Sequence, residues 1–345
     1  MQIIINTYLD RINWTEHDGV HLPMINDFLR NQFYCDIMVD NVQDKNCLDI
    51  GFGTGLLSIL ALQYGAKSII AYESDPFRFQ LGREIINSLN LKDKIHLINK
   101  KYNHTMLAKH PDVNLIYHEV VDNALWGEGL FNCIPRQYNN EIQFLPGEYF
   151  VEIYAEVVTK EFAEGLLTNA GLGFNPGVPT NTEFVNLINQ FLMQKYEAQT
   201  IIKDKQVLQQ GIMHITHTDK TFWGWQAQLK VMEYSNTSLV ASYSVNVVTN
   251  TIITTDTNRK QEITNINFTN TIQQLIIDTT EWVDKIVLLV PRCGLRHQDH
   301  QMLLDSGHWG PTPRPVLLIH PTSDLIITHD LNCIDKETGI KITNI

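Results

Sequence analysis

A glycine-rich turn between two apolar segments constrains the fold of this chain more than any other feature. Residues 47–50 (CLDI) are typical of a buried strand, residues 51–55 (GFGTG) of a tight turn, and residues 56–64 of the helix that follows. A second strand is expected at residues 68–72, directly before Glu73. Because this order of elements opens a nucleotide-binding sheet, we expect a doubly wound parallel sheet.

The spacing of the glycines indicates the class of cofactor. Glycine lets a bound molecule approach the backbone closely, since a Cβ would stand in its way. A dinucleotide fingerprint has the spacing G-x-G-x-x-G, whereas Gly51, Gly53 and Gly55 follow G-x-G-x-G with Asp49 before them. An acid there would repel a pyrophosphate but suits a cationic sulfonium, and Glu73 lies where a carboxylate can accept both ribose hydroxyls. The sequence therefore favours S-adenosylmethionine over NAD.

The length of 345 residues predicts two domains with a large core. We expect a helical cap of the cofactor site at residues 1–46, a cofactor-binding domain at 47–150 and a second domain at 151–345. No segment has the roughly 20 consecutive apolar residues of a membrane span, and the N-terminus lacks a basic region followed by an apolar stretch. A soluble, cytoplasmic protein without a membrane partner is expected.

Charge and cysteine content narrow the partners. The net charge of -12 argues against nucleic acid, because neutralising phosphates requires a basic face, and it favours cationic partners. The five cysteines are scattered and odd in number, as expected of reduced core thiols. The spacing Cys293-x3-His297-x2-His300 is superficially metal-like, but no second pair of ligands lies near it, so we expect no metal.

Strand and helix patterns alternate in the first half and give way to strands in the second. A helix is expected at about residues 77–90 and strands at 95–99 and 113–118, which places Glu73 and Glu119 at the same edge of the sheet. From residue 151 onward, further strands are expected at 226–234, 239–248, 285–290, 316–319 and 325–328, and they predict a separate barrel or sandwich.

One amphipathic helix interrupts these strands. Thr180 and Glu183 form a capping box, and an apolar stripe follows within a helical arm at about residues 160–200. This stripe suits a subunit contact and packing against its own domain about equally.

Five motifs together resemble the arginine N-methyltransferases. In order they are an N-terminal element, a glycine turn, a ribose-binding acid, a loop with two glutamates and a late His-Trp motif. The matching segments are Tyr8-Leu9-Asp10 with Met24-Ile25-Asn26-Asp27-Phe28-Leu29-Arg30, then Asp49 to Gly55, Glu73, Glu119 to Glu128, and Gly307-His308-Trp309. The combination is specific although each motif alone is not. Coverage is close over residues 8–158 and thin beyond it until residues 307–309.

The resemblance implies a cofactor site for S-adenosylmethionine. Arg30 would bind the carboxylate of the methionine part, and His21 and Met24 would cover the sulfonium region. The full set of cofactor-binding residues would be Arg30, His21, Met24, Asp49, Gly51, Gly53, Gly55 and Glu73.

The resemblance also implies catalytic and substrate-binding roles. Glu119 and Glu128 would grip the substrate guanidinium, while Asp27 and His308 would pair and steady the site. On the substrate side the candidates are Tyr8, Asp122, Trp126 and Trp309. Of these, Trp126 could either stack on the guanidinium or pack within its loop.

Three positions depart from the family pattern. The family's Thr-His-Trp is Gly307-His308-Trp309 here, and Ile12 replaces the second tyrosine of the N-terminal element. The acid expected near the adenine is missing from residues 99–104 (NKKYNH). The loop sequence around Asp122 is most similar to the monomethylating branch, and the length fits a single catalytic unit.

The chemistry of the guanidinium explains why two acids are needed. A guanidinium is a planar fork of donors that stays protonated at neutral pH, and two carboxylates can hold it by charge-assisted hydrogen bonds. We therefore expect a Rossmann-like class I methyltransferase domain followed by a β-barrel domain with a helical dimerisation insertion. The expected activity is S-adenosylmethionine-dependent monomethylation of arginine in a protein or peptide by a homodimer. Two alternatives are methylation of free arginine or another small guanidino metabolite, and a catalytically silent binding subunit.

Overall fold

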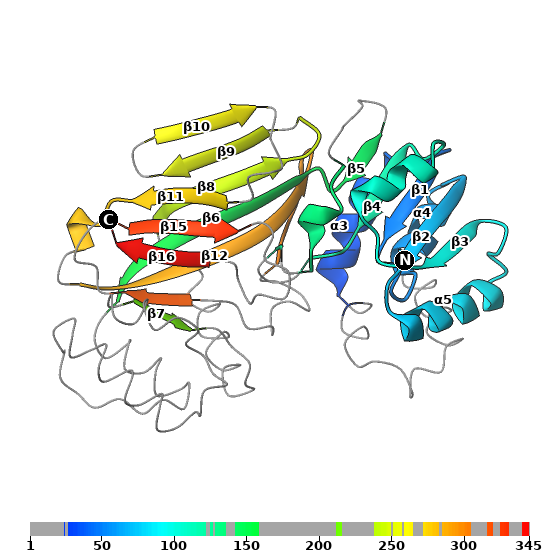
Figure 1. Cartoon of the computed structure of the whole chain (residues 1–345), viewed down its shortest axis with the longest axis horizontal. Helices are drawn as coiled ribbons and strands as arrows, with labels where there is room; N and C mark the ends of the chain where they lie inside the picture. Colours follow the sequence, from blue (N-terminus) through cyan, green and yellow to red (C-terminus); the bar gives the residue numbers. More distant parts are fainter. Residues whose placement is uncertain are drawn as a thin grey trace, which may run out of the picture.

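The structure is a computed structural model in which the described residues are 24, 27–121, 125–126, 128–135, 142–158, 212–215, 238–249, 251–256, 259–264, 272–282, 285–304, 316–319, 325–330 and 340–344. They form a parallel sheet with its helices at one end of the molecule and antiparallel sheets at the other (Figure 1). The glycine turn follows a strand of the parallel sheet. The expected change from α/β structure to β structure along the chain is present.

The parallel sheet has five strands in the order β3-β2-β1-β4-β5. Their bounds are β1 (Asn46–Ile50), β2 (Ser68–Glu73), β3 (Ile95–Asn99), β4 (Leu115–His118) and β5 (Gln143–Leu145). All neighbouring pairs are parallel, with Leu48 of β1 opposite Ile70 of β2 and Ile116 of β4. The strand order reverses between β1 and β4, and ligands bind at the carboxyl ends of strands at such a point.

Among the described residues, three α-helices flank this sheet: α3 (Phe28–Val39), α4 (Leu56–Gln63) and α5 (Pro76–Ser88). Two of them begin where an aspartate accepts a hydrogen bond from a backbone N–H of the first turn, Asp27 for α3 and Asp75 for α5. Gly55, with φ of 77°, precedes α4. Short 3₁₀ segments lie at η2 (His104–Lys109) and η3 (Leu130–Asn132). The predicted elements of this region are confirmed, with ends shifted by one or two residues.

The second half forms an antiparallel sheet of eight strands. Its main path runs β10-β9-β8-β6-β12-β14-β7, and β13 pairs with β12. The bounds are β6 (Glu148–Val158), β7 (Ile212–Ile215), β8 (Ser238–Asn246), β9 (Thr251–Asp256), β10 (Arg259–Thr264), β12 (Ile286–His297), β13 (His300–Leu303) and β14 (Val316–Ile319). A smaller sheet contains β11 (Ile272–Ile277), β15 (Leu325–Asp330) and β16 (Ile340–Asn344), and η5 (Thr280–Trp282) follows β11.

The strands predicted at residues 239–248, 285–290, 316–319 and 325–328 are confirmed as β8, β12, β14 and β15. The strand predicted at 226–234 and the helical arm at 160–200 lie outside the described residues. Strands such as β10 (RKQEIT) were missed because charged and amide side chains obscure the alternation there, and its pairing with β9 defines it. Among the described residues the pairing gives sheets, so closure into a barrel stays a prediction.

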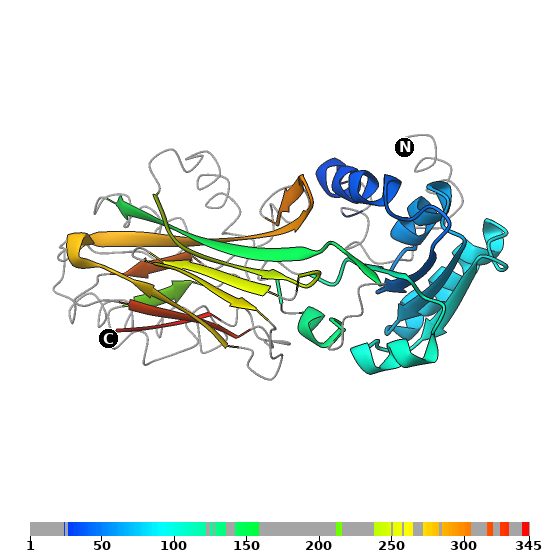
Figure 2. The same ribbon diagram turned by 90° about the horizontal axis from the view of Figure 1, so that it is seen from above.

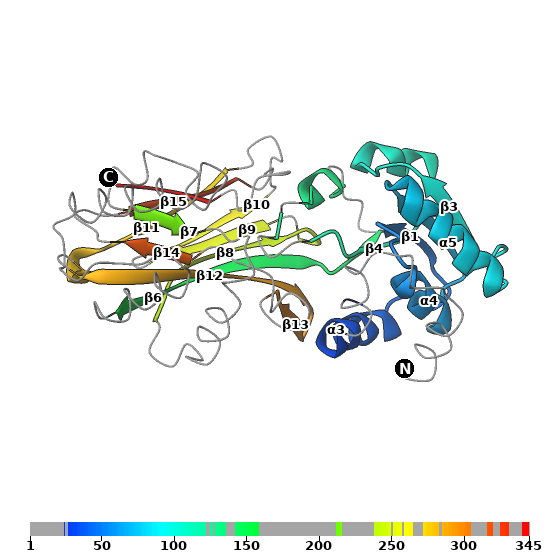
Figure 3. The ribbon, with the colours of Figure 1, turned by 90° about the horizontal axis from the view of Figure 1, so that it is seen from below.

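Two contacts join the sheets. Strand β6 begins at Glu148, three residues after β5 ends, and continues into the centre of the antiparallel sheet (Figure 2). The hairpin of β12 and β13 packs against α3, where His300 Nδ1 lies 3.9 Å from Asp36 Oδ2 (Figure 3). The two sheets are thus joined by the chain between β5 and β6 and by the packing of β13 against α3.

The described cysteines Cys35, Cys47, Cys133 and Cys293 are buried and free of disulfides, as expected of core thiols. Cys333 lies outside the described residues. None of the helices in the described part of the chain combines the length and the apolar character needed to cross a membrane.

Candidate active site

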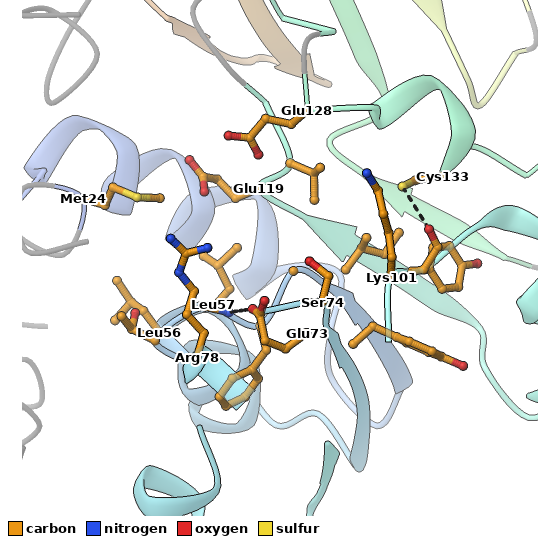
Figure 4. Close-up of a pocket in the computed structure, with 18 of the residues that line it drawn as sticks. Met24, Leu56, Leu57, Glu73, Ser74, Arg78, Lys101, Glu119, Glu128 and Cys133 are labelled. Atoms are coloured by element: carbon orange, nitrogen blue, oxygen red, sulfur yellow. Dashed lines mark hydrogen bonds between the residues drawn. The ribbon is translucent and has the colours of Figure 1, made fainter. Parts of the chain in front are cut away.

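A cavity of about 280 Å³ lies at the carboxyl ends of β1, β2 and β4 (Figure 4). Of the predicted site residues, seven line it together: Met24, Arg30, Gly51, Gly53, Glu73, Glu119 and Glu128. Met24 precedes α3, and the others come from α3, the glycine turn, the end of β2 and the segment after β4. Folding therefore brings five of the eight predicted cofactor residues and both predicted substrate acids to one cavity.

The glycine turn has the conformation that its composition predicts. Gly51, Gly53 and Gly55 all have positive φ, at 83°, 53° and 77°, a region that side chains with a Cβ rarely adopt. A Cβ on Gly51 would lie 3.2 Å from a methyl group of Val120 across the cavity wall. The turn is tied to β2, because the N–H groups of Gly51 and Phe52 both donate to the carbonyl of Tyr72.

Glu73 closes this turn at the end of β2. One carboxylate oxygen accepts the N–H of Gly53 and the other accepts the N–H of Asp75, both at 2.8 Å. The side chain of Asn99 donates to its backbone carbonyl. Each carboxylate oxygen has a second lone pair, so Glu73 is fixed in place while it retains the capacity to accept two hydroxyls.

Arg30 is buried at the opposite side of the turn, beside Glu119. Its Nε lies 3.2 Å from Glu119 Oε1, with side-chain exposures of 5% and 8%. Burial acts to lower the pKa of Arg30, but the charge of Glu119, with Tyr34 and Asp27 beyond it, raises that pKa above its ordinary value. The ion pair is close but its Nε–H has no well-formed hydrogen bond among the described residues. Arg30 lines the cavity and a guanidinium has five N–H donors, so it can take a further carboxylate.

Glu128 and Met24 complete the open side of the cavity. Glu128 is solvent-exposed, and its side chain and that of Glu119 extend toward the same part of the cavity (Figure 4). Asp27, a predicted catalytic residue, has a structural role at the start of α3. It is buried, and its Oδ1 accepts the N–H of Arg30 at 3.1 Å. Asp27 therefore acts on the site through the orientation of Arg30, and its predicted partner His308 lies outside the described residues.

Asp49 does not line the cavity in this structure, so its contact with the cofactor stays a prediction. Asp49 is 1% exposed and lies behind the turn, where Oδ2 accepts the Ser58 hydroxyl at 2.6 Å. Oδ1 has no hydrogen-bond partner among the described residues. Burial raises the pKa of Asp49 to about 8, although the hydrogen bond from Ser58 opposes the shift. The hydroxyl groups of Ser58 and Tyr117 also form a hydrogen bond with each other.

Gly55 is likewise a residue of the turn and not of the cavity wall. A Cβ at this position would meet the ring of Phe52 at 2.5 Å. Glycine is needed there to start α4 under the aromatic ring, so its role is to shape the cofactor turn.

Trp126 corrects the prediction of substrate stacking. Its side chain is fully buried, its Nε1 donates to the hydroxyl of Tyr243 at 2.9 Å, and its ring packs near Phe131 and Tyr149. A side chain without exposed surface cannot stack on a guanidinium. Its packing joins the segment after β4 to the antiparallel sheet. This agrees with the alternative that Trp126 packs within its loop.

The remaining predicted site residues, Tyr8, His21, Asp122, His308 and Trp309, lie outside the described residues. Several lining residues were missed by sequence analysis: Tyr72, Arg78, Lys100, Lys101, Tyr102 and Cys133. The sequence could have indicated some of them, because Tyr72 ends a predicted strand and residues 100–102 follow another, at the edge of the sheet where ligands bind. No group of three or more metal-ligating side chains is gathered within the described ranges.

Comparison with known proteins gives two kinds of similarity. A family model described as Ribosomal protein L11 methyltransferase (PrmA) matches residues 35–125. Protein arginine N-methyltransferase 9 of Xenopus laevis is 33% identical over 143 residues, which are 40% of this chain and 17% of that protein. Protein arginine N-methyltransferase 1 of Saccharomyces cerevisiae is 30% identical over 125 residues, 35% of each chain. The matches thus span about a third or less of these curated relatives.

Solved structures agree on the fold. A crystal structure of PRMT6 with SAH has a TM-score of 0.51 at 14% identity and covers 94% of this chain and 99% of that one. A second PRMT6 crystal structure has a TM-score of 0.52 at 12% identity, with coverages of 94% and 97%. The chain therefore has a Rossmann-like methyltransferase fold, and its sequence similarity supports a relationship to the protein arginine N-methyltransferases.

Proposed function

We propose that this protein is an S-adenosylmethionine-dependent arginine N-methyltransferase that acts on arginine in a protein or peptide. One observation carries the proposal: a single cavity joins a cofactor cradle to two carboxylates. The cradle consists of the glycine turn, Glu73 and Arg30, and the carboxylates are Glu119 and Glu128.

The residues of the cradle fit S-adenosylmethionine group by group. The backbone at Gly51 and Gly53 allows close approach, since both have positive φ and no side chain. Glu73 can accept the two ribose hydroxyls. The guanidinium of Arg30, a residue that lines the cavity, has five N–H donors and suits the carboxylate of the methionine part.

The bound cofactor supplies an electrophilic methyl group on sulfur. Glu119 and Glu128 would bind and orient the guanidinium, so that one of its nitrogens would be directed toward the methyl donor. Their charge concentrates electron density on that nitrogen, and a carboxylate can accept the proton that the methylated nitrogen loses. Orientation of this kind is worth roughly 7–11 kcal/mol in favourable cases.

Transfer of a labelled methyl group tests the proposal. The protein is incubated with labelled S-adenosylmethionine and, separately, with arginine-bearing peptides, free arginine and agmatine, and the products are identified by mass spectrometry. We expect transfer to the peptides and its loss in Glu128→Gln. Glu84→Gln, an exposed glutamate of α5 away from the cavity, is the matched control. Transfer only to free arginine or agmatine would support the small-metabolite alternative, and no transfer at all would support a binding subunit.

The number of methyl groups is a finer part of the proposal. We infer monomethylation, because an acid at Asp122 in the acceptor loop would narrow the pocket and hold a third donor of an unmethylated guanidinium. Product analysis at exhaustive turnover decides it. Monomethylarginine from the wild type and dimethylation in Asp122→Ala is the expected result, whereas predominant dimethylation by the wild type contradicts it.

The assembly is a further part. We infer a single catalytic unit per chain, a second domain that closes into a barrel, and a homodimer formed through the apolar stripe of the helical arm. The stripe includes Leu187 and Phe191. Light scattering should give a dimer for the wild type and monomers when both residues are replaced by charged ones, and a monomeric wild type at micromolar concentration would contradict the dimer.

A further inference from the structure

A buried histidine directly before Glu119 has no role in the proposal so far. His118 is the last residue of β4 and is 0% exposed. The centroid of its ring lies 5.4 Å from that of Phe144 on β5 and 5.8 Å from that of Tyr149 on β6. Burial lowers the pKa of His118 to about 3, so the ring is neutral.

The hydrogen bonds of His118 define which nitrogen carries the proton. The backbone N–H of Val120 lies 3.2 Å from Nδ1 and can only donate, so Nδ1 is the acceptor. The proton is therefore on Nε2, which donates to the hydroxyl oxygen of Tyr149 at 2.6 Å. That hydroxyl in turn donates to the carbonyl of Pro146 at 3.2 Å. The chain of bonds runs in one direction and has a single consistent arrangement.

This arrangement holds the backbone on both sides of Glu119. The carbonyl of His118 accepts the hydroxyl of Tyr34 at 2.9 Å, which fixes the peptide before Glu119. The bond from Val120 N–H to His118 Nδ1 fixes the peptide after it. Because both peptide planes are held, the direction in which the Glu119 side chain leaves the backbone is held too.

We propose that His118, supported by Tyr149, is the positioning residue that aims the Glu119 carboxylate at the guanidinium acceptor. The inference rests on the proposed function. Since Tyr149 belongs to β6, the antiparallel sheet thereby takes part in setting the acceptor site, whereas the hydrogen bonds that hold Glu73 come from Gly53 and Asp75. The expected signature is a defect confined to the acceptor side of the reaction.

Tyr149→Phe is the decisive variant. It retains the aromatic ring but removes the acceptor of the Nε2 proton, so the ring loses its preference for the tautomer that receives Val120 N–H. We expect KM for an arginine-bearing peptide to rise about tenfold with a fall in kcat. The affinity for S-adenosylhomocysteine, measured by calorimetry, should stay within about twofold. Tyr154→Phe, which removes a hydrogen-bonded hydroxyl from the same strand away from His118, is the control.

Two variants of the histidine separate positioning from packing. His118→Asn places an amide oxygen near the site of Nδ1 and can accept Val120 N–H, whereas His118→Phe fills the space without an acceptor. We expect His118→Asn to retain at least about five times the kcat/KM of His118→Phe at similar thermal stability. If His118→Phe does not fold, Tyr149→Phe against Tyr154→Phe decides the question.

Each result has a distinct reading. An active wild type with Tyr149→Phe and Tyr154→Phe indistinguishable in KM and kcat overturns the positioning role. Nitrogen NMR of the wild type that finds the His118 proton on Nδ1 overturns it as well. A wild type that transfers no methyl group to arginine refutes the proposed function, and this inference with it.

Discussion

Glu119→Gln should affect the stability of the protein as well as its chemistry, because Glu119 faces the buried guanidinium of Arg30 at 3.2 Å. Removing one partner of a buried ion pair costs about 3–5 kcal/mol, since the other charge stays buried without its counter-ion. Arg30 retains the side chain of Asn31, which accepts from NH1 at 3.0 Å, and the charge of Asp27 nearby. The loss should therefore fall near the lower limit, at about 3 kcal/mol.

Glu128→Gln supplies the contrast. Glu128 lines the same cavity but is exposed to solvent, and substitutions at exposed positions usually change stability by less than about 0.5 kcal/mol. Both variants should lose turnover, because both acids are proposed to hold the acceptor. The measurement is urea unfolding of the three proteins without cofactor, with midpoints and slopes compared.

Saturating S-adenosylhomocysteine should narrow the difference between Glu119→Gln and the wild type, since its carboxylate would give Arg30 a new partner. Equal stability of Glu119→Gln and Glu128→Gln without cofactor would refute the reasoning from the buried pair. A gap that S-adenosylhomocysteine leaves unchanged would refute the assignment of Arg30 to the cofactor carboxylate.

Three further predictions follow from the turn and its surroundings. Glu73→Ala removes the acceptor of two backbone N–H groups and should weaken S-adenosylhomocysteine binding by at least about 1–3 kcal/mol in calorimetry; unchanged affinity would exclude Glu73 from the cofactor site. Burial raises the pKa of Asp49 to about 8, so the folded state binds more protons than the unfolded state between about pH 4 and 8. The stability of the wild type should therefore fall relative to that of Asp49→Asn as pH rises through this window. Parallel stability curves of the two proteins would show that Asp49 is ionised throughout. Trp126→Phe leaves the Tyr243 hydroxyl without its indole donor and should lower the unfolding free energy by about 1–3 kcal/mol with KM for the peptide unchanged; a raised KM at wild-type stability would restore the stacking role.

The sequence was sufficient for the elements in which local chemistry and tertiary structure agree. The glycine spacing predicts a turn with positive φ at Gly51, Gly53 and Gly55, and the structure has it. The position of Glu73 after an apolar strand likewise predicts its place at the edge of the sheet, because parallel strands share their carboxyl ends. The position of Glu119 at this edge was predictable for the same reason, because it directly follows a predicted strand.

Tertiary structure alone decided the roles of side chains whose type suits several environments. An aspartate before a glycine turn can face a ligand or the interior, and Asp49 faces Ser58 because β1 is covered by α4. A tryptophan in a loop can stack on a substrate or fill a core, and Trp126 is buried because the antiparallel sheet reaches it through Tyr243.

The cofactor turn and the acceptor site differ in the same way, because the first depends on local sequence and the second on contacts between distant residues. Strand pattern and glycine spacing are local, so residues 47–73 determine their own turn and the cavity edge by themselves. The ion pair of Arg30 with Glu119 and the bond of His118 to Tyr149 join residues 89 and 31 positions apart, and no local pattern encodes such contacts. They exist because the sheet brings β4 between α3 and β6, where burial requires each polar group to find a partner.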